Sequence, residues 1–391
     1  MNEPIIRIAA RGDGVTPSGR HVPFGVPGDA LLDDGALAFG PHHQEPPCSL
    51  FPECGGCQLQ HVDDEAYRGY LVSRIETALA QHGLETQIRS PHLSPPCSRR
   101  RSTLKALQVG KQVLIGFNAE MSHRIVDMRE CHVLRPELFA LVEPLRQVLD
   151  GMIHPKRTAE VQLTLVDYGV DVLLKGVPAG RMTEIEQLTT FARKHDVARI
   201  SVDRGLGPDT IFAPQPATIT LSGIPVAFPH GGFLQATQEG EDALVDAVRE
   251  TAAGGSRVAD LFSGLGTFAL ATGARYAAEA SRDAAAALKR ALPAAAVEHR
   301  DLYRRPLDKD ELRGFDTVIL DPPRAGAQEQ VAHLARAAVP RIAYVSCNPA
   351  TFARDAKMLF DGGYRLDWIE PVGQFRWSTH VELAASFSRR K

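Results

Sequence analysis

From about residue 236 onward, strand-like apolar runs alternate with helix-like segments, and this alternation restricts the fold more than any other feature of the chain. A helical stretch reaches Thr251, and it is followed by "SRVADLFSGLG", "ARYAAEA", "AAAVEHRDL", "FDTVILDPP" and "RIAYVSCNP", with Ala-rich or amphipathic helices between most of them. Such alternation is typical of a doubly wound, mostly parallel α/β sheet whose ligand binds at the carboxyl ends of the strands. We therefore predict a Rossmann-like domain over residues 236–391.

Two smaller regions precede this domain. Residues 1–45 contain short strand-like runs broken by Gly and Pro, which predicts a short β-module. Residues 46–235 are expected to form a mixed, β-rich central domain, in which "VQLTLVDYGVDVLLKGV" (161–177) predicts a hairpin. An amphipathic helix is expected over residues 65–84, because large apolar side chains recur there at four-residue steps. These side chains are Tyr67, Leu71, Ile75 and Leu79.

Composition predicts a cytoplasmic globular protein. Of the 391 residues 44% are hydrophobic and 23% charged, no apolar run reaches about 18 residues, and "MNEPIIRI" lacks the basic end of a secretory signal. The net charge of −3 gives no overall attraction to nucleic acid, but between Arg89 and Arg124 seven Lys or Arg residues stand against one acid. We expect this segment either to bind nucleic-acid phosphates or to be an ordinary solvated face. The expected contacts are Arg99, Arg100, Arg101 and Lys105.

The stretch "VADLFSGLGTFAL" has the form of a cofactor-binding turn. An apolar strand ends at Asp260, Gly264 and Gly266 form a tight turn, and a helix begins. Glu279 follows 19 positions after Asp260, at the next strand end, where an acid would hydrogen-bond a ribose. With Ala269 the loop also satisfies the loose dinucleotide fingerprint, so a nicotinamide cofactor and a purely structural turn are alternatives. A carboxylate at the mouth of the loop favours a ligand with an ammonium and a sulfonium group, so we expect S-adenosylmethionine.

Later strand ends supply further polar groups. Asp301 in "VEHRDL" is expected to face the adenine, with Glu298 as the alternative. "VILDPPRAG" puts Asp321 at the end of a fourth strand, and "AYVSCNPATF" puts Cys347 at the end of a fifth. A lone cysteine at a strand end is more often a core residue, but the "NP" that follows should end the strand and leave the thiol facing the crevice. We therefore expect the carboxylate and the thiol at the same sheet edge as the cofactor.

A thiol beside a methyl donor has a chemical meaning for pyrimidines, whose carbon 5 is too weakly nucleophilic to attack a sulfonium. A thiolate that adds to carbon 6 turns the ring into an enolate, which makes carbon 5 nucleophilic. After methyl transfer a base must remove the proton from carbon 5, so that the thiol can leave. "RWSTHVELAASF" offers His380 and Glu382, which alternate on a predicted last strand and so would share one face.

The stretch "CSLFPECGGCQLQH" concentrates Cys48, Cys54 and Cys57 within ten positions of a chain that has six cysteines. Thiols stay reduced in the cytosol, so clustered cysteines there more often hold metal or do chemistry than form disulfides. Zinc and an iron-sulfur centre both accept four thiolates, and the spacing alone does not separate them. Gly55 and Gly56 would let the backbone fold closely around a metal.

Together, "DPPR", "SCNP", "HVE" and the cysteine cluster resemble the RNA 5-methyluridine (uracil-C5) methyltransferase family, over nearly the whole chain from Cys48. The resemblance is closest to the iron-sulfur branch that modifies 23S ribosomal RNA, since the transfer-RNA branch lacks this cysteine set. It implies S-adenosylmethionine-dependent methylation of carbon 5 of a uridine through a covalent cysteine-uracil adduct. In that mechanism Cys347 would be the nucleophile and Glu382 the base.

The resemblance further implies the ligands of a 4Fe-4S cluster, which would act as a structural clamp: Cys48, Cys54, Cys57 and Cys131. It also carries the family's cofactor contacts onto five positions: Gln235 in "GGFLQAT", Phe262, Glu279, Asp301 and Asp321. Three positions depart from the family pattern: Thr237, Ser263 and Thr267. The β-module is shorter than the family's usual RNA-binding barrel, as in a reduced TRAM or OB-like unit. The expected partner is RNA, most of all ribosomal RNA, and we expect a monomer without membrane association.

Three other functions stay open on the sequence. One is methylation of transfer RNA in place of ribosomal RNA. A second is a non-catalytic RNA-binding protein with a methyltransferase fold, although the intact Cys347, Asp321 and Glu382 argue against lost activity. The third is an NAD-dependent oxidoreductase, which would leave Cys347 and the clustered cysteines without a role.

Overall fold

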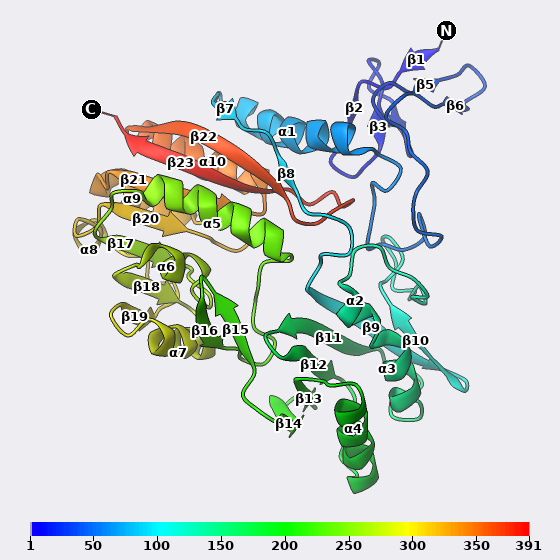
Figure 1. Ribbon diagram of the computed structural model, residues 1–391. Coiled ribbons are helices and arrows are strands. Elements are labelled where there is room, and N and C mark those ends of the chain that lie inside the picture. Colours follow the sequence, from blue (N-terminus) through cyan, green and yellow to red (C-terminus); the bar gives the residue numbers. More distant parts are fainter. Residues whose placement is uncertain (1, 391) are drawn as a thin grey trace.

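The computed structural model describes residues 2–390, and its largest element is a nine-stranded sheet (Figure 1). The strands follow the order β19-β18-β17-β20-β21-β23-β22-β7, and β8 also pairs with β22. The first five strands in this order are parallel. They are β19 (Ala296–His299), β18 (Tyr276–Glu279), β17 (Val258–Leu261), β20 (Thr317–Leu320) and β21 (Arg341–Ser346). β23 (Glu382–Arg389) runs antiparallel to β21 and to β22 (Tyr364–Gly373), while β7 (Gln87–Ile88) and β8 (His92–Leu93) run parallel to β22.

Helices cover both faces of this sheet, which confirms the predicted doubly wound α/β class. Every residue of β17 and β20 is buried, as expected for central strands of a parallel sheet. One face packs against α5 (Gln238–Ala252), α6 (Thr267–Thr272) and α7 (Arg282–Ala291). The other face packs against α1 (Asp64–Ala80), α8 (Lys309–Leu312), α9 (Gln328–Ala337) and α10 (Pro349–Asp361). The strand order reverses between β17 and β20, so a ligand is expected beyond the carboxyl ends of these two strands.

The amphipathic helix predicted over residues 65–84 is α1. Its N-terminus is capped by Asp63, whose side chain accepts a hydrogen bond from the Ala66 amide at 2.8 Å. The four side chains predicted for its apolar face are at most 2% exposed. α1 contacts α10 and β22, and β7 and β8 follow it in the chain. The segment 64–93 therefore belongs to the large sheet, although it precedes the central sheet in sequence.

A six-stranded sheet forms the central part of the molecule, in the order β10-β9-β11-β12-β13-β14. Its strands are β9 (Arg101–Val109), β10 (Gln112–Gly116), β11 (Ala159–Val166), β12 (Gly169–Lys175), β13 (Arg199–Asp203) and β14 (Pro208–Phe212). β11 and β12 pair antiparallel, which confirms the predicted hairpin. Three helices accompany this sheet: α2 (Pro136–Phe139), α3 (Val142–Leu149) and α4 (Met182–Lys194). A separate hairpin leads to the large sheet: β15 (Thr218–Leu221) and β16 (Ile224–Ala227).

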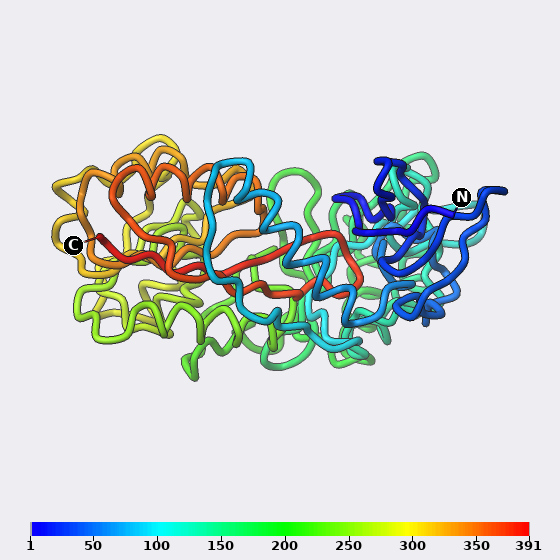
Figure 2. The backbone as a smooth tube through the Cα atoms, turned by 90° about the horizontal axis from the view of Figure 1, so that it is seen from above, coloured from blue at the N-terminus to red at the C-terminus, as the bar shows by residue number. Residues whose placement is uncertain are grey.

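The N-terminal region consists of very short strands in two three-stranded sheets, as the Gly and Pro breakers predicted. One sheet contains β1 (Glu3–Pro4), β5 (Ala30–Leu31) and β6 (Leu37–Ala38). The other contains β2 (Arg7–Ile8), β3 (Gly14–Val15) and β4 (His21–Val22). These sheets lie at one end of an elongated molecule, and β22 and β23 extend toward the other end (Figure 2). Within residues 2–390 no helix is long and apolar enough to cross a membrane.

Candidate functional site

A cavity of about 530 Å³ opens beyond the carboxyl ends of the parallel strands. Its walls come from the loops after β17, β18, β19, β20 and β21, and from the segment that leads into β23. The cavity brings together all seven residues predicted for catalysis and cofactor binding: Gln235, Phe262, Glu279, Asp301, Asp321, Cys347 and Glu382. The iron-sulfur ligands predicted from the cysteine cluster do not line it.

The glycine turn after β17 forms one wall of this cavity. Gly264 and Gly266 have φ angles of 55° and 93°, in the left-handed region that favours glycine. A Cβ on Gly266 would lie 2.3 Å from the Leu288 Cδ1 atom, so α7 can approach the turn only because this residue is glycine. The Glu279 carboxylate accepts a hydrogen bond from the Gly264 amide at 2.9 Å. This contact fixes the turn against the end of β18.

Asp260 lies in a different place from the one predicted. It is fully buried inside β17, which ends at Leu261, and it does not line the cavity. Both of its carboxylate oxygens lack a hydrogen-bond partner. Burial and the nearby carboxylates of Asp321 and Glu279 hold its pKa well above the usual value. The charges at the mouth of the cavity come from other carboxylates, among them Asp321.

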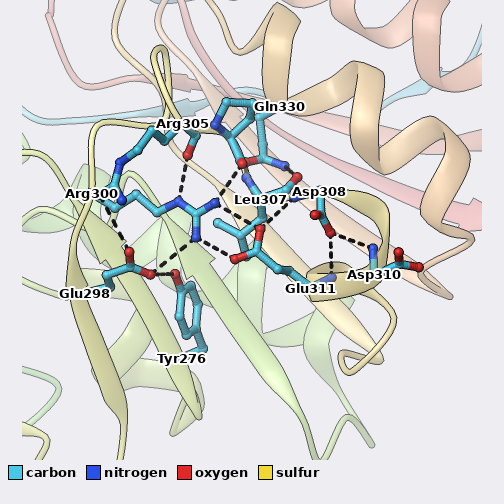
Figure 3. A network of polar contacts seen from close by, with 10 residues as sticks. Tyr276, Glu298, Arg300, Arg305, Leu307, Asp308, Asp310, Glu311 and Gln330 are labelled. Atoms are coloured by element: carbon cyan, nitrogen blue, oxygen red, sulfur yellow. Dashed lines mark hydrogen bonds and ion pairs between the residues drawn. The ribbon is translucent and has the colours of Figure 1, made fainter.

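Asp301 and Glu298 were the two candidates at the end of β19, and their surroundings differ. Glu298 accepts a hydrogen bond from the Tyr276 hydroxyl at 2.6 Å and pairs with Arg300 at 3.4 Å (Figure 3). Arg300 in turn binds both oxygens of Glu311, at 2.7 and 2.9 Å. Glu298 is thus occupied within a structural network, whereas Asp301 lines the cavity. The geometry favours Asp301 over Glu298 as the residue available to the cofactor.

Aromatic side chains form the apolar part of the cavity. The rings of Phe262 and Tyr303 lie 5.6 Å apart at 56° to each other, and both line the cavity. The Tyr303 hydroxyl donates to the Gly326 carbonyl oxygen at 2.9 Å, which joins this wall to the loop after β20. The sequence analysis did not identify Tyr303, because no strand-end motif marks it.

Cys347 and Glu382 face the same cavity from neighbouring strands. Cys347 directly follows β21, and Glu382 is the first residue of β23, which pairs with β21. Burial, together with the carboxylates of Glu382 and Asp321, raises the pKa of the Cys347 thiol to about 11. Burial and the Asp321 carboxylate raise the pKa of Glu382 to about 8, against the opposing effect of Arg101. Burial and Glu279 likewise raise the pKa of Asp321 to about 7. The cavity therefore concentrates negative charge that has too little positive charge to balance it.

His380 also lines the cavity, but the prediction that it lies on the last strand was wrong. β23 begins at Glu382, and His380 belongs to the preceding loop, where its amide donates to the Ser378 hydroxyl at 3.2 Å. Its ring lies 5.4 Å from the ring of Phe375, another residue of the cavity wall. Burial and the charges of two arginines lower the pKa of His380. The arginines are Arg324 and Arg99.

The prediction that the basic run 99–105 presents its charges to phosphates was wrong for Arg100. Arg100 is 4% exposed, and its Nη2 atom lies 2.6 Å from Glu241 Oε2. The Lys105 ammonium lies 2.6 Å from Glu160 on the neighbouring strand β11. Arg101 lines the cavity, where its guanidinium lies 4.4 Å from the centre of the Phe233 ring. Phe233 was not singled out from the sequence, and Arg101 was expected only as a phosphate contact.

The four clustered cysteines line a second, small cavity of about 20 Å³, and none of them forms a disulfide. Burial and the nearby Cys131, Cys54 and Cys48 thiols together raise the pKa of Cys57 to about 12. Within the described chain, no three or more His, Cys, Asp or Glu residues are already arranged around one point as metal ligands. Cys97 lies outside this cavity, with its sulfur 3.7 Å from the His132 carbonyl oxygen.

The two glycines among these cysteines approach the chain that faces them. A Cβ on Gly55 would lie 2.7 Å from the Asn118 carbonyl oxygen, and one on Gly56 would lie 2.9 Å from the Phe117 ring. The Gly55 amide donates to the same Asn118 oxygen at 3.0 Å. The two glycines therefore allow a close approach to residues 117 and 118, and the expected folding of the backbone around a metal stays a prediction.

Comparison with known proteins identifies the family. Residues 282–390 match the family model described as tRNA (Uracil-5-)-methyltransferase. An uncharacterized RNA methyltransferase of Zymomonas mobilis is 49% identical over 98% of this chain and 99% of its own length. The 23S rRNA (uracil(1939)-C(5))-methyltransferase RlmD of Photorhabdus laumondii is 30% identical over 90% of this chain and 84% of its own.

A solved structure shares the architecture. The tRNA (uracil-54, C5)-methyltransferase of Pyrococcus abyssi, in complex with S-adenosyl-L-homocysteine, superposes with a TM-score of 0.77 and 26% identity, over 99% of both chains. Its bound ligand is the demethylated form of S-adenosylmethionine. From the cavity at the strand ends, the family model and these relatives, we conclude that the chain belongs to the RNA uracil-5-methyltransferase family and has its S-adenosylmethionine-dependent fold.

Proposed function

We propose that this enzyme methylates carbon 5 of a uridine in 23S ribosomal RNA through a transient bond between Cys347 and the uracil ring. The observation that carries this proposal is the opening of Cys347, Glu382 and the glycine turn onto one cavity. The 30% identity to a 23S rRNA methyltransferase and the cysteine set support ribosomal RNA. Transfer RNA is the second candidate, favoured by the likeness to the archaeal tRNA enzyme.

The cofactor would occupy the part of the cavity lined by Gln235, Phe262, Glu279, Asp301 and Asp321. S-adenosylmethionine carries a sulfonium and an ammonium. Burial and neighbouring carboxylates raise the pKa values of Asp321 and Glu382, so a cationic ligand would stabilise their ionised forms. Glu279 ends β18, the position from which an acid binds a ribose in doubly wound folds. The aromatic pair of Phe262 and Tyr303 offers an apolar surface for the adenine.

The chemical steps follow from the two residues at the β21 and β23 ends. The Cys347 thiol would first lose its proton to solvent. The thiolate sulfur would then form a bond to carbon 6, and the electron pair of the 5,6 double bond would move into the carbonyl as an enolate. Carbon 5 would then take the methyl group from the sulfonium. The Glu382 carboxylate would remove the proton from carbon 5, after which the carbon–sulfur bond breaks and the double bond reforms. A pKa of about 8 suits a base that must accept a proton near neutral pH.

We also propose that Cys48, Cys54, Cys57 and Cys131 hold a 4Fe-4S cluster. Two observations support the fit: all four line one enclosed cavity, and the Arg99 charge lies near the Cys57 and Cys131 thiols. The side chains would have to turn toward a common point, since they do not yet surround one. When bound, the cluster would cross-link residues 48–57, here called the cysteine loop, to the chain near residue 131. Zinc is the alternative, and an absorbance spectrum with metal analysis separates the two.

The order of the sheets along the chain supports a division into three domains. We propose a β-module over residues 1–45, a central domain over 46–235 and the methyltransferase domain over 236–391, with segment 64–93 packed on the last. The enzyme would act as a monomer on RNA in the cytoplasm, without membrane contact.

The deciding experiment maps 5-methyluridine in ribosomal and transfer RNA from cells with and without the gene. Loss of the modification at a position in 23S rRNA supports the proposal, and the purified enzyme should then restore it on that RNA. Loss confined to transfer RNA would establish the second candidate, and no loss in either RNA would contradict both.

A further inference from the structure

Trp377 binds to the cysteine loop through both its side chain and its backbone. Its side chain is 5% exposed and packs with Cys57, Cys131 and Val133 in a separate hydrophobic cluster. Its carbonyl oxygen accepts hydrogen bonds from the amides of the two residues that follow Cys57, at 2.8 and 2.9 Å. These residues are Gln58 and Leu59. Any change in the cysteine loop therefore acts directly on Trp377.

Trp377 also belongs to the loop between β22 and β23, here called the catalytic loop (residues 374–381). This loop carries Phe375 and His380, both of which line the large cavity. On its other side it is held by α1: the Tyr67 hydroxyl lies 3.0 Å from the Phe375 carbonyl oxygen, and the Tyr70 hydroxyl donates to the oxygen of residue 379 at 3.2 Å. The catalytic loop is thus hydrogen-bonded to α1 on one side and to the end of the cysteine loop on the other.

The backbone of Trp377 depends on these contacts. Its φ angle is 57°, in the left-handed region that a bulky residue rarely adopts and keeps only when its surroundings enforce it. Its indole Nε1 is buried without a hydrogen-bond partner. The paired amides of Gln58 and Leu59 on its carbonyl oxygen are the contacts that fix this conformation.

A small third cavity completes the connection between the two sites. Gly56 and Val133 line both the cysteine cavity and this third cavity. Phe375 lines both the third cavity and the large one, and the Arg99 guanidinium lies 5.5 Å from the centre of its ring. The third cavity therefore shares lining residues with the cysteine site on one side and with the catalytic site on the other.

We propose that Trp377 is a positioning residue that couples the metal state of the four cysteines to the catalytic loop. With the metal bound, the cysteine loop is fixed and Trp377 holds Phe375 and His380 at the cavity wall. Without the metal, the Gln58 and Leu59 amides lose their fixed partner and the catalytic loop loosens. This inference rests on the proposed metal centre and on the proposed methylation.

The direct test is hydrogen exchange of the wild-type protein, metal-loaded and after metal removal by a chelator. We expect the Gln58 and Leu59 amides and the catalytic loop to exchange at least about tenfold faster in the metal-free protein. The segment 238–261, which forms α5 and β17, is the internal control, and its exchange should not change. Equal exchange of the catalytic loop in both forms would overturn the proposal, as would a protein that binds no metal.

Variants of the two tryptophans separate positioning from general stability. Trp377→Ala should retain the metal, exchange its catalytic loop rapidly in both metal states, and lower kcat about tenfold while KM for the methyl donor is unchanged. Trp377→Phe should restore the slow exchange of the catalytic loop and the kcat of the metal-loaded wild type, because an aromatic ring still packs against the cysteines. Trp368→Phe, on β22 beneath Arg89, is the matched control and should behave as wild type.

The outcomes are distinct from those of the proposed function. Wild-type kcat and wild-type exchange in metal-loaded Trp377→Ala would overturn the coupling. If the wild-type enzyme methylated no RNA, the proposed function would fail, while the exchange comparison would still decide whether the metal state controls the loop.

Discussion

The two cavities of this enzyme use cysteine in opposite ways. Cys347 stands at the end of a regular strand among carboxylates, whereas the four clustered cysteines lie on loops among one another. Burial raises the thiol pKa in both places, to about 11 for Cys347 and about 12 for Cys57. In the proposed function the sulfonium would bring positive charge to Cys347, and a metal would bring it to Cys57, where Arg99 already lies nearby. Under the proposed function, the same side chain would serve transient chemistry in one cavity and permanent metal binding in the other.

The largest effect that distinguishes the two cavities is expected for Cys347→Ala. Loss of the nucleophile should lower methylation by about 10⁴-fold or more, with unchanged metal content. Mass spectrometry of RNA incubated with the methyl donor measures this effect. Cys97→Ala is the matched control, because Cys97 lines neither cavity, and it should keep full activity. Undiminished methylation by Cys347→Ala would rule out the covalent mechanism.

Glu382→Gln should separate bond formation from bond breaking. Methyl transfer can proceed, but the proton on carbon 5 stays, so the Cys347–uracil bond persists and turnover falls by about 10²- to 10⁴-fold. A slow-migrating protein–RNA band on a denaturing gel detects the adduct. The double variant with Cys347→Ala must lose this band. If the single variant gives none, Glu382 is not the base.

Removal of one clustered thiol should affect stability more than chemistry. Cys54→Ala is expected to lose the metal and to lower Tm by at least about 5 °C, because a bound metal that cross-links distant loops contributes to folding. Methylation should fall far less than in Cys347→Ala. Metal analysis, absorbance and thermal unfolding measure these effects. An unchanged metal content would show that Cys54 is not a ligand.

The smallest expected effect is on how stability and kcat/KM change with pH. The Glu382 pKa of about 8 lies above its ordinary 4.5, so the folded protein favours the protonated acid, and this contribution to stability is lost as pH rises from about 4.5 through about 8. The base must be ionised for turnover, so kcat/KM for the methyl donor should rise through about pH 8. The free energy of unfolding, measured in urea at a series of pH values, should change with pH differently in wild type and in Glu382→Gln only between about pH 4.5 and 8. A kcat/KM that is flat between pH 6 and 9 would contradict the assigned base.

The comparison also shows what the sequence could and could not predict. Cys347, Asp321 and Glu279 were predictable because apolar strands and the breakers after them are local patterns, and parallel strands bring their ends together. Arg100 was not, because its partner Glu241 is 141 residues away and no local pattern links them. The burial of Asp260 followed from its place one residue inside β17, a shift below the precision of a strand boundary read from sequence.

The pairing of β7 and β8 with β22 has a consequence for synthesis of the chain. The Thr86 hydroxyl binds the Leu366 carbonyl oxygen across 280 residues of sequence, and β23 lies between β21 and β22. The strands within residues 86–93 therefore stay unpaired until β22 and β23 have been translated. A nascent chain would keep this edge exposed through most of elongation, and the sheet, with Glu382 in it, can close only at a late stage of translation.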